Sequence, residues 1–187
     1  MKKALIIGAI LLMAGCSSTI ETTYYQLPAG NSAQISSSAS GNPPMLWVEQ
    51  VTVPDYLAGN GLVYQTSDVK YVIAANNLWA SPLDQQLKQT LVTNLSKALP
   101  GRLVASNTPA ELHDTLSVTV SGFQGRYDGK VVISGEWLLD HQGRFIKQGF
   151  DVTVPQTEDG YDAMVRALAQ GWQQAAQQMA NSVASLN

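Results

Sequence analysis

Strict alternation of apolar and polar residues runs through residues 115–127, TLSVTVSGFQGRY. Leu116, Val118 and Val120 fall on one side of the chain, and serine or threonine falls on the other. This period of two predicts a β-strand with one buried face. The same criteria, together with composition rich in Thr, Tyr or Val, predict further strands at residues 22–27, 45–53, 62–66, 69–74, 102–106 and 145–154.

The dipeptide Asp128-Gly129 is a strong signal for a two-residue β-hairpin turn after this strand. When the next strand is paired back from that turn, the apolar sides of the two strands coincide, which supports the register. A second turn is predicted at residues 141–145, where Gly143 can take a positive φ. The predicted cross-strand pairs are Tyr127 with Lys130, Val120 with Trp137, and Val118 with Leu139.

A period of about four predicts two amphipathic helices. In the first, leucine recurs every fourth residue between Pro82 and Leu99, with Ser81 suited to the N-cap and a Pro-Gly pair at the end. The second is expected from near Glu158 to the C-terminus. The elements together predict an α+β fold, a mostly antiparallel sheet with both helices packed on one face. The apolar stripe of the second helix is Tyr161, Val165, Leu168, Trp172, Ala175, Met179, Val183 and Leu186.

The first fifteen residues, MKKALIIGAILLMAG, have the layout of a secretory signal. Lys2 and Lys3 precede an apolar stretch that is too short to cross a bilayer. Cys16 follows small residues that resemble the lipobox of bacterial lipoproteins, although Met13 stands where leucine is preferred. The alternative is a buried free cysteine in a helix. On the lipoprotein interpretation, the signal is cleaved before Cys16, and acyl chains on its thiol and its new amine anchor the protein.

These features divide the chain into a cleaved signal peptide (1–15), a lipidated tether (16–21) and a single α+β domain (22–187). The tether reaches about 20 Å when fully extended, so the domain is expected close to the membrane. Residues 28–44 are rich in Ser, Gly, Asn and Pro and carry no charge, which predicts a flexible loop. By the sorting rule of Gram-negative lipoproteins, Ser17 predicts the outer membrane, with the domain facing the periplasm.

Charged residues make up only 13% of the chain, about half of the usual fraction. Loss of the signal would remove two lysines and change the net charge from −3 to −5. An acidic domain without a polybasic stretch is not expected to bind nucleic acid. Because Cys16 is the only cysteine, an internal disulfide is excluded, and no Cys/His cluster indicates a zinc site.

The sequence also lacks catalytic motifs. Neither His113 nor His141 has metal-ligand spacing, and both are expected to be solvated, in a loop and in a hairpin turn. The chain contains no GxSxG, HExxH or P-loop motif, and no GxGxxG motif after a strand. We therefore expect no enzyme activity, no cofactor and no metal.

Two blocks in the first half of the chain carry a resemblance to a known family. They are VPDYL at 53–57 with the strand LVY at 62–64, and Trp79 ahead of SPL at 81–83 with Leu87, Leu91 and Leu95; Tyr24, Tyr25 and Leu27 after the lipobox also match. As a pair, these blocks are fairly specific. The chain resembles the ABC-type transport auxiliary lipoproteins from the lipobox to about Leu99, and the remaining elements follow in the order of that family.

The resemblance implies a non-enzymatic accessory subunit of an envelope lipid-transport system. Such systems contain a mammalian-cell-entry (MCE) domain protein that spans the periplasm as a tube. The lipoprotein would dock this tube to the outer membrane and support membrane integrity. Two alternatives stay open, a lipid carrier with its own acyl-sized cavity and an envelope hydrolase. A solid core favours the docking subunit, an apolar hollow the carrier, and a convergent Asp/His/Ser group the hydrolase.

Partner contacts are expected in the blocks that carry the resemblance. Each residue there also has an ordinary alternative, such as a strand-ending turn for the Pro-Asp pair, an edge strand for the two tyrosines, or a place in the core for the tryptophan. The expected contact residues are Tyr24, Tyr25, Pro54, Asp55, Tyr56, Leu57 and Trp79.

The C-terminal helix carries no charged residue after Arg166. A solvated helix face usually carries Lys and Glu, which are depleted at the centre of protein interfaces. We therefore expect the uncharged face to pack on a second copy of the chain, and a ring would suit a rotationally symmetric tube. The alternative is a neutral polar face in a charge-poor protein. The face consists of Gln170, Gln173, Gln174, Gln177 and Asn181.

Overall fold

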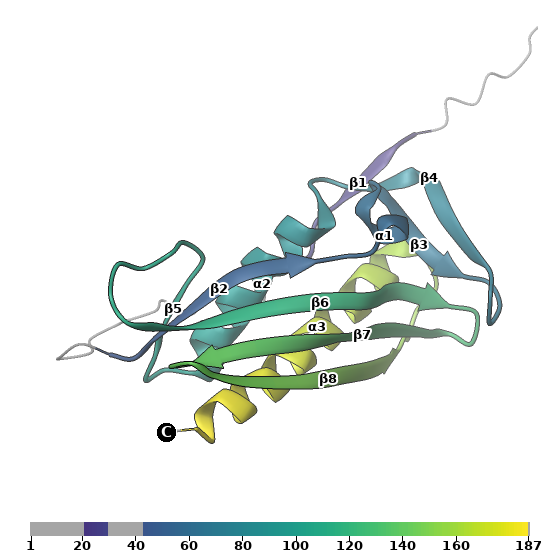
Figure 1. Cartoon of the computed structure of the whole chain (residues 1–187). Coiled ribbons are helices and arrows are strands. Elements are labelled where there is room, and N and C mark those ends of the chain that lie inside the picture. Colours follow the sequence, from purple (N-terminus) through teal and green to yellow (C-terminus); the bar gives the residue numbers. More distant parts are fainter. Residues whose placement is uncertain (1–20, 30–42, 187) are drawn as a thin grey trace, which may run out of the picture.

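The computed structural model describes residues 21–29 and 43–186 (Figure 1). The expected signal peptide, Cys16 and most of the expected loop at 28–44 lie outside the described residues. Within the described residues, eight strands form one sheet and three helices accompany it, which confirms the predicted α+β class. The strands are β1 (Thr23–Tyr25), β2 (Met45–Thr52), β3 (Gly61–Gln65), β4 (Tyr71–Trp79), β5 (Leu103–Ala105), β6 (His113–Arg126), β7 (Lys130–His141) and β8 (Arg144–Pro155). The helices are α1 (Asp55–Ala58), α2 (Leu83–Ala98) and α3 (Tyr161–Ala184).

Strand β6 forms the centre of the sheet, because it pairs with three other strands. Strand β7 runs antiparallel along one edge, and β8 is antiparallel to β7. The other edge pairs in parallel with β2 over its first half and with β3 at its end. Strand β5 extends the sheet beyond β2, while β4 and then β1 extend it beyond β3. Most of the paired residues lie in the three antiparallel ladders, as predicted.

The turn between β6 and β7 is longer than predicted. It contains three residues, 127–129, so Lys130 pairs with Arg126 rather than with Tyr127. Gly129 closes this turn with a φ of 74°, a conformation that glycine adopts without strain. A type I turn followed by a left-handed glycine is a common three-residue hairpin connection. The signal for a hairpin was correct, and the loop length derived from it was wrong.

A β-bulge between Val120 and Gly122 moves the register by one further residue. Val118 therefore lies opposite Trp137, and Val120 lies opposite Gly135, so the predicted pairing of Val120 with Trp137 is wrong. Two single-residue shifts add up to two, and a shift of two returns every side chain to its original face. Val118, Val120 and Trp137 are all buried, as the alternation indicated.

Helices α2 and α3 pack on the same face of the sheet, as predicted (Figure 1). Helix α2 covers β2 and β5, α3 covers β7 and β8, and the two helices contact each other. At Gly171, α3 comes so close to the sheet that an added Cβ would lie 2.2 Å from Cδ1 of Ile133. Close packing thus explains a glycine in the middle of this helix.

Helix α1 was not predicted. It is a single turn in the segment expected to be a Pro-Asp turn, and two of its backbone N–H groups donate to the carbonyl oxygen of Pro54 (2.9 and 3.1 Å). Helix α3 begins at Tyr161, three residues later than predicted. The reason is Gly160, whose φ of 99° lies outside the helical region.

The start of α2 is held by a buried glutamine rather than by a serine cap. Pro82 occupies the N-cap position, and no side chain caps the helix there. The side-chain amide of Gln86 donates to the carbonyl oxygen of Ser81 (2.8 Å), and its Oε1 accepts from the backbone N–H of Leu27 (2.7 Å). Gln86 therefore ties the segment after β1 to the first turn of α2.

A row of four aromatic rings fills the space between the sheet and the helices. Trp79 contacts Phe123, and Phe123 contacts Trp172, with ring centroids 6.2 and 6.4 Å apart. Trp172 in turn contacts Phe150 at 6.0 Å and donates its indole N–H to the carbonyl oxygen of Leu87 (3.2 Å). The buried core is therefore continuous from β4 to β8 and bonded to both long helices.

Candidate functional site

The β3–β4 hairpin lies at the same end of the molecule as β1 (Figure 1), and it carries exposed apolar residues. On the β3–β4 hairpin, Val69 is 76% exposed, and Tyr71, Val72 and Ile73 are between 44% and 53% exposed. Successive residues of a strand point to opposite faces, so both faces of this hairpin expose apolar side chains. We call these four residues the hairpin patch. Tyr24 of β1 is also largely exposed.

Tyr56 fixes helix α1 between the sheet and the hairpin patch. Its hydroxyl donates to the backbone carbonyl oxygen of Ser121 at the bulge of β6 (2.8 Å). Its ring lies against the ring of Tyr71, with centroids 5.2 Å apart. Burial, and to a smaller extent the nearby Tyr71, raises the pKa of Tyr56 to about 12. The hydrogen bond and the ring contact hold α1 at the surface of the sheet, where Pro54 is half-buried and Asp55 is exposed.

The seven expected contact residues divide into two groups. Leu57 and Trp79 are only 1% and 4% exposed, so both belong to the hydrophobic core. They present no surface to a partner, and the alternative of a core position is the correct one for them. Tyr25 is half-buried; its hydroxyl donates to Oδ1 of Asn77 (3.3 Å). Tyr24, Tyr25, Pro54, Asp55 and Tyr56 remain at the surface, and we call these five the contact surface.

The sequence did not point to the hairpin patch as a candidate site. Residues 69–74 were predicted as an ordinary strand, and strand residues with apolar side chains are expected to be buried on one face. The available signal was the run of three neighbouring apolar residues at 71–73, since a half-buried strand alternates.

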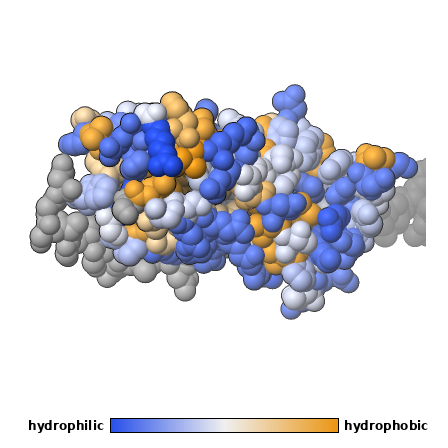
Figure 2. Space-filling model, turned by 60° about the horizontal axis from the view of Figure 1, so that its bottom comes forward, coloured by the Kyte–Doolittle hydropathy of each residue, from blue (hydrophilic) through white to orange (hydrophobic). Residues whose placement is uncertain are grey.

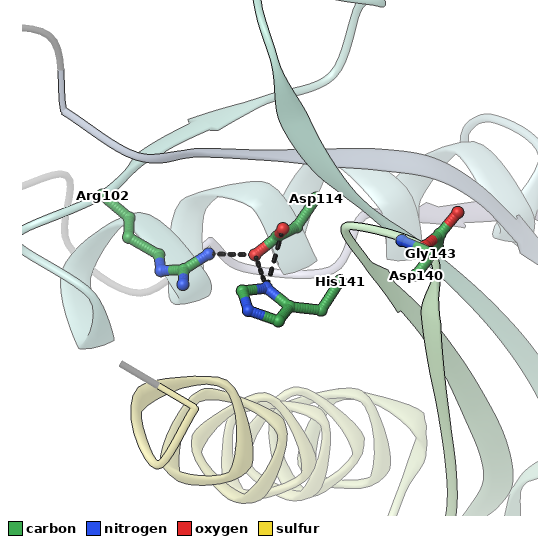
Figure 3. A network of polar contacts seen from close by, with 5 residues as sticks. All are labelled: Arg102, Asp114, Asp140, His141 and Gly143. Carbon is green, nitrogen blue, oxygen red and sulfur yellow. Dashed lines mark hydrogen bonds and ion pairs between the residues drawn. The ribbon is translucent and has the colours of Figure 1, made fainter.

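A polar network lies around the start of β6 and the end of β7 (Figure 3). An amino group of Arg102 contacts Oδ2 of Asp114 at 2.5 Å, and both side chains are almost fully buried. Nδ1 of His141 lies 2.9 Å from each oxygen of the same carboxylate. Nearby, Oδ1 of Asp140 accepts from the backbone N–H of Gly143 (2.8 Å) and shapes the β7–β8 turn.

Both histidines differ from their expected solvated positions. His141 is half-buried and hydrogen-bonded to Asp114 in this network. His113 is the first residue of β6, where Nδ1 lies 2.7 Å from the carbonyl oxygen of Glu111 and the ring packs edge-on against Trp47. The sequence separation between Asp114 and its two partners explains why a local pattern could not reveal the network.

The network has part of the geometry of a hydrolase. An aspartate that orients a histidine through Nδ1 is one half of a Ser-His-Asp arrangement. Among the described residues, no hydroxyl or thiol makes a hydrogen bond to His141, and Arg102 shares the carboxylate. A hollow of about 150 Å³ beside the network is lined in part by Leu112 and Met45. The contact between Arg102 and Asp114 is therefore a buried ion pair that connects the start of β6 to the segment before β5.

The five expected interface residues of α3 are all exposed. Gln177 donates to Oδ1 of Asn181 (3.0 Å), and Gln173 and Gln177 line a shallow hollow together with Asn94 and Lys97 of α2. We call the five expected interface residues the glutamine face; they are uncharged, and Lys97 of α2 lies beside Gln173 and Gln177. Figure 2 shows one face of the molecule, on which hydrophobic residues form separate patches among hydrophilic ones.

Within residues 21–29 and 43–186, no helix is both long and apolar enough to span a membrane. The same residues contain no group of three His, Cys, Asp or Glu side chains arranged to hold a metal ion.

The family model described as "ABC-type transport auxiliary lipoprotein component" matches residues 25–180, so the chain belongs to this family, as the sequence indicated. Two curated relatives, from Escherichia coli (strain K12) and Shigella flexneri, are each named "Intermembrane transport lipoprotein PqiC". Each is 61% identical to this chain over 187 residues and is matched over its full length.

Solved structures agree with the fold. A crystal structure of an uncharacterized protein is 60% identical, with a TM-score of 0.79 over 87% of this chain and 99% of the other. Protein XCC0632 from Xanthomonas campestris shares the fold at 16% identity, with a TM-score of 0.69 over 85% of this chain and 93% of the other.

Proposed function

We propose that this chain is an outer-membrane lipoprotein, anchored through Cys16, that docks the periplasm-spanning tube of an MCE-type lipid-transport system to the outer membrane. Membership of the auxiliary lipoprotein family supports a role as an accessory subunit of a transport system. The name of the two relatives, intermembrane transport lipoprotein, supports transport between membranes. Docking the tube in this way contributes to the integrity of the envelope.

The filled core is the observation that supports docking of a tube over transport of a lipid in a cavity of this protein. The row of aromatic rings occupies the layer between sheet and helices, where an acyl chain would have to enter. An open hollow of about 330 Å³ lies beside the start of α3, and the charged residues Arg126 and Asp159 line it together with Tyr64 and Met164. An acyl cavity would instead be lined mainly by apolar side chains.

The polar network supports a non-enzymatic subunit. A hydrolase needs a nucleophile within hydrogen-bond reach of its base. His141 contacts Asp114, and Arg102 contacts the same carboxylate, so the described contacts account for a structural ion pair.

Partner contact is assigned to the contact surface, which includes Tyr24 and Tyr25 of β1. Docking at this end would bring the tube to the side of the domain from which the tether leaves. The glutamine face of α3 is assigned to a second copy of the chain, which would match a ring of lipoproteins to a rotationally symmetric tube.

Affinity capture of the full-length protein from solubilised membranes tests the docking function. With Cys16 intact, we expect an MCE-domain protein in the captured material, identified by mass. The variant with Asp55→Lys and Tyr24→Asp should lose it, and Asp84→Lys on the half-buried start of α2 is the control. If wild-type protein captures no MCE-domain protein from membranes that contain one, the proposal fails.

Anchoring is tested separately by metabolic labelling with a palmitate analogue. Cys16→Ser should remove the label and leave the domain folded, because Cys16 precedes the expected domain. Ser17→Asp should keep the label and hold the protein at the inner membrane. Label retained by Cys16→Ser would contradict the lipid anchor.

A further inference from the structure

The hairpin patch is exposed on both of its faces, although the ring of Tyr56 in α1 packs against Tyr71. Tyr71 and Ile73 point to one face of β4, Val72 points to the other, and Val69 lies in the turn. Isolated apolar residues at a surface are ordinary, whereas a contiguous group on a projecting element marks a contact with a partner or a membrane.

Several hydrogen bonds form within the turn that carries Val69. The backbone N–H of Thr66 donates to the carbonyl oxygen of Lys70 (2.8 Å), and the hydroxyl of Thr66 donates to the same atom (3.3 Å). The side-chain amide of Gln65 donates to the carbonyl oxygen of Asp68 (3.3 Å). A turn with internal partners can leave water at a lower cost than one that depends on solvent. Asp68 and Lys70 also cancel in charge at this tip.

The register of β1 shows in which direction the tether leaves the domain. Strand β1 is parallel to β4, and Thr23 pairs with Asn77. The chain before Thr23 therefore leaves the sheet on the side where β4 begins, which is the side of the hairpin patch. Seven positions separate Lys70 from Asn77, and seven separate Cys16 from Thr23. At about 3.3–3.6 Å per residue, the tether is long enough to bring the acyl chains on Cys16 level with the hairpin tip.

We infer that the hairpin patch is a membrane-contacting element, which enters the boundary between headgroups and acyl chains of the bilayer that holds the lipid on Cys16. This inference rests on the lipid anchor of the proposed function and adds a second point of attachment. Aliphatic side chains enter the acyl boundary, and tyrosine is suited to its polar edge. Two attachments fix the orientation of the domain, with β1 and the hairpin toward the membrane and β5 away from it (Figure 1).

The single cysteine makes this orientation directly measurable. Acylation consumes the thiol of Cys16, so Val69→Cys creates the one free thiol of the mature chain. Leu112→Cys is the matched control, because Leu112 is 81% exposed and lies in the loop before β6, on the β5 side. Both full-length variants are labelled with the environment-sensitive dye NBD and reconstituted into vesicles of phosphatidylethanolamine and phosphatidylglycerol (3:1), without any partner protein.

We expect a blue shift and loss of iodide quenching for NBD at residue 69, and water-like emission with full quenching at residue 112. Water-like emission at residue 69 in vesicle-bound protein would overturn the inference. A blue shift that appears only after an MCE-domain protein is added would also overturn it and assign the hairpin patch to that protein. Labelling of two thiols per chain would show instead that Cys16 is not acylated, so the lipid anchor would be the claim that fails.

Discussion

At the scale of single residues, Trp137 tests the buried face of the sheet. It is 2% exposed and lies opposite Val118. Trp137→Ala is expected to lower the free energy of unfolding by about 3–5 kcal/mol, because truncation of a buried aromatic leaves a cavity. Leu138 is the control, since it points to the opposite face and is 40% exposed. Leu138→Ala should change stability by about 0.5 kcal/mol or less. Equal losses in urea unfolding would contradict the assignment of faces.

The buried ion pair makes a second residue-scale prediction. Asp114→Asn removes the carboxylate charge that both Arg102 and His141 contact, and breaking a buried pair typically costs about 3–5 kcal/mol. Asp128→Asn is the matched control, because Asp128 pairs with Arg126 at the surface and asparagine also suits that turn. Urea unfolding should show a large loss for the first variant and a small one for the second. A loss at residue 114 no larger than that at residue 128 would show that the network is not a structural one.

Side chains such as these lie beyond sequence-based prediction for a clear reason. Asp114 contacts residues that are 12 and 27 positions away, and Gln86 bonds to a residue 59 positions away. Alternation and helical periods describe local geometry, so they identified the apolar core and left these polar contacts unassigned.

At the scale of elements, Tyr56 attaches helix α1 to the bulge of β6. Its pKa is raised to about 12, whereas an unfolded tyrosine ionises near pH 10. Between these values the unfolded state loses its proton first, so wild-type stability falls as the pH rises through this window. Tyr56→Phe lacks this loss. The stability difference between the two proteins should be largest below about pH 10 and should shrink toward about pH 12. Denaturant unfolding across this range checks it, and a constant difference would contradict the raised pKa.

Periodicity was sufficient to predict the two long helices, the β6–β7 hairpin and its buried face. The register was missed because a three-residue turn and a bulge at Ser121 each insert one residue, and neither leaves a distinct signature in composition. The late start of α3 follows from the backbone conformation of Gly160, which sequence alone leaves open.

At the scale of the whole molecule, the glutamine face of α3 predicts self-association. Gln173→Lys together with Gln177→Lys places two charges on this face, beside Lys97 of α2, and should lower the native mass. Gln85→Lys with Gln89→Lys is the control, since these residues are exposed on α2 with the same spacing of four. Light scattering measures the mass. A monomeric wild-type protein at high concentration would contradict self-association, and an unchanged mass in the double variant would place the interface elsewhere.

The family could be expected from the VPDYL and Trp-x-x-Pro-Leu blocks. These blocks also contain Leu57 and Trp79, which are buried in the core. A sequence motif does not distinguish residues needed for packing from residues needed for contact with a partner. The hairpin patch is exposed because the other elements of the folded protein leave most of it uncovered. The sequence does not show how these elements pack around the hairpin. The surface could therefore be found only in the structure.

Flotation of a purified MCE-domain tube with vesicles tests the central claim most directly. Vesicles that carry the full-length acylated protein should bring the tube to the top of a density gradient, whereas bare vesicles should leave it at the bottom. Vesicles that carry the Asp55→Lys, Tyr24→Asp variant should behave like bare vesicles. A tube that stays at the bottom with wild-type vesicles, or floats equally with bare vesicles, would contradict docking by this lipoprotein.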